Sequence, residues 1–87
     1  MVSLDPEDMG PVVNRLRRAQ GQLGGVLAMI EDGRECEDVV TQLAAVSKAV
    51  DRAAYSIIAT TLRRCIDAGD EESLDAKRLE KIFLSLA

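Results

Sequence analysis

The longest hydrophobic pattern in the chain lies between Cys36 and Cys65 and has the spacing of an amphipathic helix. Its main apolar row advances in alternating steps of four and three residues, which is the repeat of a helix-packing seam. A second apolar row lies beside the first near the C-terminal end, so we expect this helix to have two partner surfaces. The main row is Val39, Leu43, Val46, Val50, Ala53 and Ile57, and the second is Ala54, Ile58, Thr61 and Cys65.

An earlier helix is predicted over residues 12–30, where apolar residues again recur every three or four positions. Its start is open, because Asp5-Pro6 is typical of a helix N-terminus and a helix beginning at Gly10-Pro11 fits as well. Asp32-Gly33 is expected to end the helix, since glycine accepts the left-handed conformation that follows a last turn. The apolar positions are Val12, Val13, Leu16, Ala19, Leu23, Val26, Leu27 and Ile30.

Three glycines, Gly21, Gly24 and Gly25, interrupt this first helix. Each costs about 1 kcal/mol relative to alanine in a helix interior. Two interpretations explain how that cost could be offset. The glycines let another helix pack closely, or they belong to a helix that is held only by an oligomer and is able to shift.

A short third helix is predicted after the acidic turn at residues 70–72, with Ser73 as its N-cap. We expect it to be a packing element. The pattern contains no internal repeat and no linker, which favours one domain over residues 1–87. The apolar side of this helix is Leu74, Leu79, Ile82, Phe83 and Leu86.

The fold class expected from these patterns is all-α, with three helices per chain. The first two helices would form an antiparallel hairpin, and two hairpins would pair as a four-helix bundle. A chain of 87 residues builds only a marginal core by itself, so an oligomer is expected. The composition agrees: it is 47% hydrophobic, but Tyr55 and Phe83 are its only aromatic residues, which favours closely packed aliphatic helices over sheets.

The sequence shows neither a signal peptide nor an apolar run long enough to span a membrane, so we expect a cytoplasmic protein without a membrane partner. In that reducing compartment two cysteines are more typical of free thiols, metal ligands or redox sensors than of a standing disulfide.

The net charge of −4 argues at first against nucleic acid, but its distribution changes the picture. Residues 9–30 contain three arginines and no acid, and residues 39–66 contain four basic residues against one acid, so each segment carries +3. A basic face on an acidic protein is consistent with DNA binding, and a merely solvated charged face is the common alternative.

The two cysteines are too far apart to meet within one chain. They are separated by 29 residues of predicted helix, which places them roughly 40 Å apart. Two such helices packed antiparallel would have their twofold axis near Val50 and Asp51, and Cys36 of each would lie beside Cys65 of the other. We therefore expect an inter-subunit dithiol site, the alternative being that Cys65 is only a small core residue.

The chemistry open to this dithiol is limited because the chain contains no histidine. Tetrahedral zinc sites need four ligands, and nickel or cobalt sites favour imidazole. Cu(I) stays open, because a soft monovalent ion accepts two thiolates. Sulfur chemistry stays open as well, since one thiolate can attack a reactive sulfur species and the other can resolve the product into a bridge.

A family resemblance is carried by residues 14–50, which read NRLRRAQGQLGGVLAMIEDGRECEDVVTQLAAVSKAV, and by the following DRAA and the cysteine at 65. This segment resembles the CsoR/RcnR/FrmR/CstR family of small bacterial repressors, which includes sensors of copper, nickel or cobalt, formaldehyde and persulfide. The resemblance implies hairpin dimers assembled into a flat, disc-like tetramer. It also implies operator DNA that is released when the thiol site is occupied.

Carried over by position, Cys36 and Cys65 match the two cysteines of the copper sensors, while Thr61 stands at the histidine ligand position. Val2 stands where formaldehyde sensors have proline. A dithiol without the histidine resembles the persulfide-sensing branch, so the expected inducer is a reactive sulfur species with no cofactor, and a Cu(I)-responsive repressor is the alternative. The resemblance assigns DNA contacts to Arg15, Arg17, Arg18, Lys48 and Arg52.

Two other classes of protein stay open at this point. One is a small dithiol enzyme or sulfur carrier, which no CxxC motif or general base supports, so the expectation is that the chain is not an enzyme. The other is a purely structural helical assembly protein. Neither class needs sequence-specific DNA binding.

Overall fold

A computed structural model of the chain describes residues 3–69 and 73–86. In these residues every regular element is helical: a short 3-10 helix η1 (Pro6–Asp8), then α1 (Gly10–Glu31), α2 (Cys36–Asp67) and α3 (Leu74–Leu86). The all-α expectation is confirmed. The acidic turn at residues 70–72 and Val2 lie outside the described residues.

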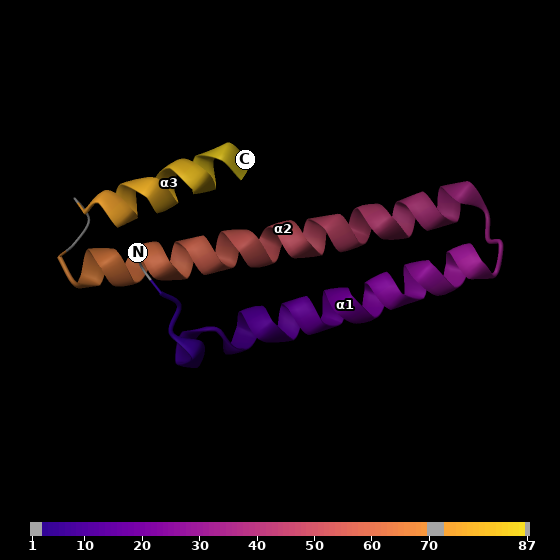
Figure 1. The fold of residues 1–87 in the computed structure, drawn as a ribbon, viewed down its shortest axis with the longest axis horizontal. Coiled ribbons are helices and arrows are strands. Elements are labelled where there is room, and N and C mark those ends of the chain that lie inside the picture. Colours follow the sequence, from indigo (N-terminus) through magenta and orange to yellow (C-terminus); the bar gives the residue numbers. More distant parts are fainter. Residues whose placement is uncertain (1–2, 70–72, 87) are drawn as a thin grey trace.

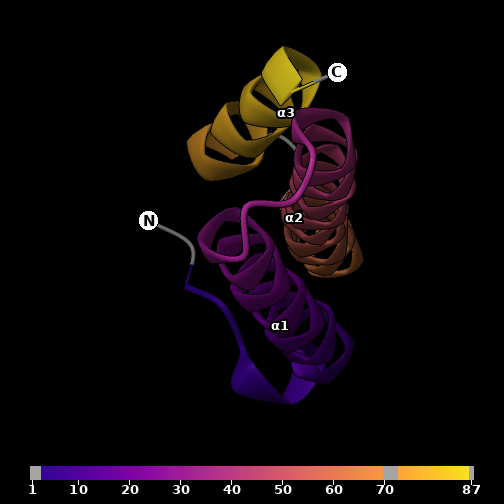
Figure 2. The same ribbon diagram turned by 90° about the vertical axis from the view of Figure 1, so that its right-hand side faces the viewer.

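Helices α1 and α2 form the expected antiparallel hairpin, and α3 folds back along the C-terminal half of α2 (Figure 1). Seen from the end of the hairpin, α1 and α3 lie on different sides of α2 (Figure 2). The central helix α2 therefore packs against both of the others, whereas the sequence pattern predicts a second subunit, and not α3, as its other partner. The molecule is elongated, about 53 Å by 26 Å by 16 Å.

Each of the two candidate helix starts, Asp5-Pro6 and Gly10-Pro11, begins a helical element, but the two elements are different. Asp5 caps η1 by accepting a hydrogen bond from the Glu7 amide at 3.0 Å, with Pro6 in the first position. The chain then turns at Met9, and α1 begins at Gly10 with Pro11 in its first turn, where proline costs no helical hydrogen bond. Residues 3–9 are thus a separate segment rather than a distorted helix end.

The helix end predicted at Asp32-Gly33 agrees with the structure, and α2 ends in the same way at Gly69. Gly33 and Gly69 have φ of 70° and 72°, a conformation that side chains with a Cβ rarely adopt. The Ser73 hydroxyl accepts a hydrogen bond from the Ala76 amide at 3.1 Å, as expected of an N-cap.

The core within one chain is small and uses only part of each apolar row. Met9, Val12 and Ala53 form a buried cluster, with Ile57 packed against it. Ala19, Val26 and Val46 are buried as well. Much of the remaining predicted hairpin face is exposed, because one partner helix covers only a narrow stripe of its neighbour. The exposed members, which we call the apolar stripe, are Val13, Leu16, Leu23, Leu27 and Ile30 of α1 and Leu43 and Val50 of α2.

Helix α3 buries only part of the face predicted for it. Ala76 is buried, and Phe83 packs edge-to-face on Tyr55 with ring centroids 5.3 Å apart. The Tyr55 hydroxyl also donates a hydrogen bond to the Leu86 carbonyl. Leu79 and Phe83 of the predicted apolar side are half-buried, whereas Leu74, Ile82 and Leu86 of that side are exposed in the single chain.

The close packing expected at the three helix glycines is not made within the chain. No atom of another element lies within 4 Å of a Cβ placed on Gly21, Gly24 or Gly25. Among the described residues, no helix is long and apolar enough to cross a membrane.

Candidate functional site

A basic groove runs between α1 and α2 and brings together four of the five predicted DNA-binding residues. Arg15 and Arg18 approach it from α1, and Lys48 and Arg52 approach it from α2. The spacing of three in α1 and four in α2 puts each pair on one side of its helix. The groove encloses about 770 Å³. Residues that are thirty or more positions apart in the sequence therefore share one surface.

The remaining lining of the basic groove is neutral. Gln22 and Ser56 add polar groups, and the Tyr55–Phe83 pair closes one end. Among the described residues that line it, none is acidic. A concave surface with four cations and no carboxylate has the charge that phosphate groups require. Arg17 is exposed but is not part of the groove.

The two cysteines lie on the same side of α2, near its opposite ends. Cys36 is the first residue of the helix and is exposed, whereas Cys65 is buried. Their separation of 29 residues is about eight full helical turns, so both side chains leave the helix in nearly the same direction. Leu43 and Val50 of the apolar stripe are seven and fourteen residues from Cys36, and they leave the helix on that side too.

Thr61, which the family resemblance places at a histidine ligand position, is buried one turn before Cys65. Its hydroxyl donates a hydrogen bond to the Ile57 carbonyl at 2.8 Å, within the same helix. The hydroxyl hydrogen is thus engaged by the backbone. Thr61 and Cys65 line a cavity of about 290 Å³ between α2 and the N-terminal segment.

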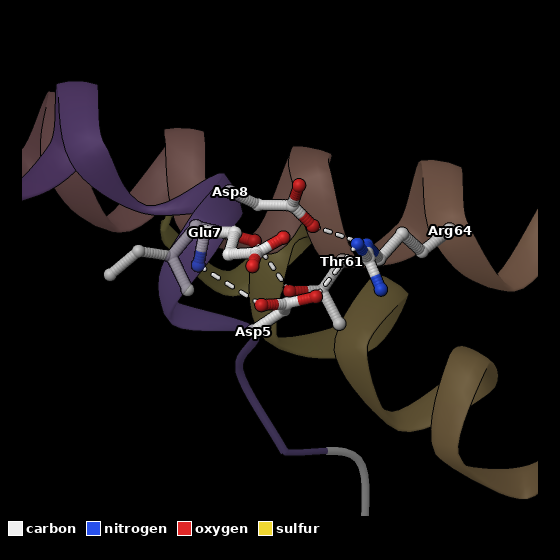
Figure 3. Close-up of polar contacts among 6 residues, drawn as sticks. Asp5, Glu7, Asp8, Thr61 and Arg64 are labelled. Carbon is white, nitrogen blue, oxygen red and sulfur yellow. Dashed lines mark hydrogen bonds and ion pairs between the residues drawn. The ribbon is translucent and has the colours of Figure 1, made fainter.

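The N-terminal segment is tied to α2 beside this cavity by an ionic cluster (Figure 3). The Arg64 guanidinium contacts the Asp5 carboxylate at 2.9 Å and also pairs with Asp8. The hydrogen bond to Asp8 is the largest cause that raises the pKa of Arg64 above its usual value. We call Asp5, Asp8 and Arg64 the N-terminal clasp. The sequence pattern assigned Asp5 only a capping role and Asp8 none.

The family model described as "Metal-sensitive transcriptional repressor" matches residues 9–85 of the chain. The chain belongs to this family. The match covers α1, α2 and nearly all of α3, and therefore includes the basic groove and both cysteines. The family consists of transcriptional repressors and not of enzymes.

Curated relatives and a solved structure agree with the family assignment. The repressor is 43% identical over 58 residues to the uncharacterized protein YrkD of Bacillus subtilis, covering 67% of this chain and 92% of YrkD. It is 32% identical over 73 residues to the copper-sensing transcriptional repressor CsoR of the same organism, covering 79% and 72% of the two chains. The copper-sensing transcriptional repressor RicR of Mycobacterium tuberculosis is 40% identical over 52 residues, 60% of this chain and 54% of RicR.

The crystal structure of the copper-sensing repressor CsoR with Cu(I) from Geobacillus thermodenitrificans superposes with a TM-score of 0.73 at 25% identity. The superposition covers 98% of the repressor and 92% of that CsoR. The family resemblance expected from residues 14–50 is confirmed by these matches, and the expected three-helix fold is confirmed with it.

The donor set of the repressor is unusual for a metal site. Among the described residues, no group of three or more Cys, His, Asp or Glu side chains is close enough to hold a metal ion. Within one chain Cys36 and Cys65 lie near opposite ends of α2. A metal ion or other group bound by both thiols would therefore need one cysteine from each of two chains. Two thiolates suit a soft monovalent ion such as Cu(I), and the Thr61 oxygen is a hard donor that does not replace an imidazole.

Proposed function

We propose that the repressor binds operator DNA through the basic groove and releases it when an inducer occupies the Cys36 and Cys65 thiols. The single observation that carries the DNA-binding part is the convergence of Arg15, Arg18, Lys48 and Arg52 on one groove without an acid among its described lining. Repetition of this groove in an oligomer would concentrate positive charge, so that a chain of net charge −4 still holds phosphate.

The proposal needs a dimer, and the apolar stripe supports one. Leu16, Leu23 and Leu27 are between 39% and 55% exposed in the single chain, which is a large apolar surface for so small a protein. The α2 members of the stripe, Leu43 and Val50, lie on the same side of α2 as both cysteines. Two antiparallel copies packed on this side would bury the stripe and place Cys36 of one chain beside Cys65 of the other. A flat tetramer of two such dimers is the family arrangement that we expect.

A charge in the middle of the apolar stripe is expected to break the dimer. Glutamate at Leu23 (Leu23→Glu) would place an unpaired carboxylate in the proposed interface, at a cost that shifts the dissociation constant by at least about a hundredfold. Sedimentation velocity at micromolar concentration should show monomer. Leu84→Glu is the matched control, because Leu84 is 64% exposed on α3, and it should leave the dimer intact. A dimeric Leu23→Glu protein would contradict this interface.

Cu(I) is the inducer that the relatives favour. Two of the relatives and the superposed structure are named as copper-sensing repressors, and thiolates are the soft ligands that Cu(I) prefers. In the proposed dimer each Cu(I) would be held by Cys36 of one chain and Cys65 of the other. The chain itself would supply only these thiolates, because it contains no histidine.

A reactive sulfur species is the second candidate, and Thr61 is the observation that favours it. A hydroxyl engaged with the Ile57 carbonyl stands at the ligand position, which weakens a metal site but does not affect thiol chemistry. One cysteine thiolate would attack the outer sulfur of a persulfide RSSH, releasing the thiolate RS⁻ and forming a cysteine persulfide. The second cysteine thiolate would then attack the inner sulfur and release HS⁻, leaving an inter-subunit disulfide.

Parallel titrations of the operator complex with Cu(I) and with a persulfide donor separate the two inducers. Operator release by stoichiometric Cu(I), with an unchanged protein mass after chelation, would support copper sensing. Release by the persulfide donor, with a covalent dimer on non-reducing electrophoresis, would support sulfur sensing. Failure of both to release the operator would overturn the proposed role of the thiol pair.

A further inference from the structure

The cavity beside Cys65 is an approach to this otherwise buried thiol, and its charge is set by the N-terminal clasp. Cys65 is only 7% exposed, and it contributes to the cavity wall together with Thr61. The opposite wall is the N-terminal segment, which Figure 3 shows crossing α2 at Arg64. A reagent that enters this cavity on its way to the sulfur therefore passes the side chains of the clasp.

Among the described residues, the charged ones that line the cavity are the two aspartates and the arginine of the clasp, so their sum is −1. Arg64 is the residue next to Cys65 in the chain, and an unpaired guanidinium there would attract anions. Both carboxylates instead contact it, Asp5 at 2.9 Å and Asp8 directly. Because these contacts satisfy the guanidinium, the cavity presents an excess of negative charge to an incoming molecule.

We propose that Asp5 and Asp8 are specificity-determining residues that mask Arg64, so that Cys65 reacts with uncharged or cationic thiol-seeking species in preference to anionic ones. The inference rests on the proposed function only in taking Cys65 as a thiol on which the inducer acts. The inference adds the chemical class of that inducer. The cavity would admit a neutral sulfur donor or a soft cation to Cys65, and it would disfavour a species that carries a carboxylate. Unit charges that line the same cavity as the reacting sulfur are expected to change a rate by roughly threefold to tenfold each.

Two alkylating reagents of matched size and different charge test this selectivity directly. Iodoacetamide is neutral and iodoacetate is anionic, and with either one the Cys65 thiolate forms a carbon–sulfur bond and displaces iodide. The assay uses the full chain with Cys36→Ser, so that Cys65 is its only thiol. The measured quantity is the ratio of the iodoacetate rate to the iodoacetamide rate, followed by mass spectrometry.

Neutralising either aspartate is expected to raise this rate ratio by roughly threefold to tenfold, and Arg64→Gln is expected to lower it by a similar factor. Asp5→Asn keeps a good N-cap for η1, so the segment should stay folded. Raising the salt concentration should reduce all three differences, because it screens the charges. Asp51→Asn is the control of equal charge change, placed fourteen residues and about 20 Å along α2, and it should leave the ratio unchanged.

Two results would overturn the proposal. Equal acceleration of both reagents in Asp5→Asn and Asp8→Asn would mean that the segment only covers the thiol. An unchanged rate ratio in all clasp variants would mean that charge at the cavity does not reach Cys65. The assay contains neither DNA nor inducer, so its failure is distinguishable from failure of the proposed repressor function, which operator binding measures separately.

Discussion

Joint replacement of Arg15 and Arg18 by alanine is expected to weaken operator binding by at least tenfold to a hundredfold at about 0.1 M salt. Both side chains lie in the basic groove on one face of α1, and each lost phosphate contact lowers the salt slope of binding by about one. The variant's slope of log affinity against log salt should therefore fall by about two for each chain that contacts DNA. Fluorescence anisotropy with labelled operator at several salt concentrations measures both quantities.

Arg17→Ala is the matched comparison, because it removes the same charge from the same helix outside the groove. The sequence resemblance assigns Arg17 to the DNA contacts together with Arg15 and Arg18, whereas the groove geometry separates it from them. We expect a loss several times smaller for Arg17→Ala than for either groove arginine alone. Equal losses would support the sequence assignment over the groove, and unaltered binding by a folded Arg15→Ala/Arg18→Ala variant would sink the proposed interface.

Serine in place of either cysteine is expected to leave the operator bound at inducer concentrations that fully release the parent protein. The proposed site uses one thiol from each chain, so loss of either removes both the two-coordinate Cu(I) site and the inter-subunit disulfide. We expect the inducer concentration for half-release to rise at least about a hundredfold. Operator affinity without inducer should change little, because neither cysteine lines the basic groove. Gel shift with increasing inducer gives both values.

Thr61→Val is the control for these thiol variants. Valine preserves the shape of the buried side chain and removes only the hydroxyl that donates to the Ile57 carbonyl. If Thr61 takes no part in inducer binding, the response should stay within about threefold of the parent. A large loss in Thr61→Val would instead make this hydroxyl part of the site, and a normal response in Cys36→Ser would exclude the pairing of thiols across the dimer.

The helices were predictable because their signals are local. Gly33 and Gly69 end helices by their own backbone conformation, and the Ser73 cap acts within three residues. The apolar rows identified which residues seek burial. They did not identify which partner would cover each one, because a row of α1 faces both α2 and the proposed second chain. Val12 became core and Leu23 became exposed surface for that reason.

The candidate site was predictable in its residue types and less so in its geometry. The two cysteines and the basic residues stand out in the sequence. Helix periodicity puts Arg17 on a different side of α1 from Arg15 and Arg18, but only the structure shows which side borders the groove. The clasp was missed because Asp5 and Arg64 are 59 residues apart and neither belongs to a periodic pattern. Such a contact becomes visible only when the N-terminal segment is placed across α2.

One unbroken helix carries Cys36 and Cys65 on one side and two cations of the basic groove, Lys48 and Arg52, on another. A rigid rod of this kind cannot turn at the thiols without turning at the groove. At a side-chain radius of about 6 Å, a 10° rotation of α2 moves a charged tip by about 1 Å. That displacement is enough to spoil a hydrogen bond to phosphate, whose useful range of lengths is only about half an ångström. Rotation of one helix as a rigid body would then couple inducer binding to operator release, without a chain of separate side-chain contacts.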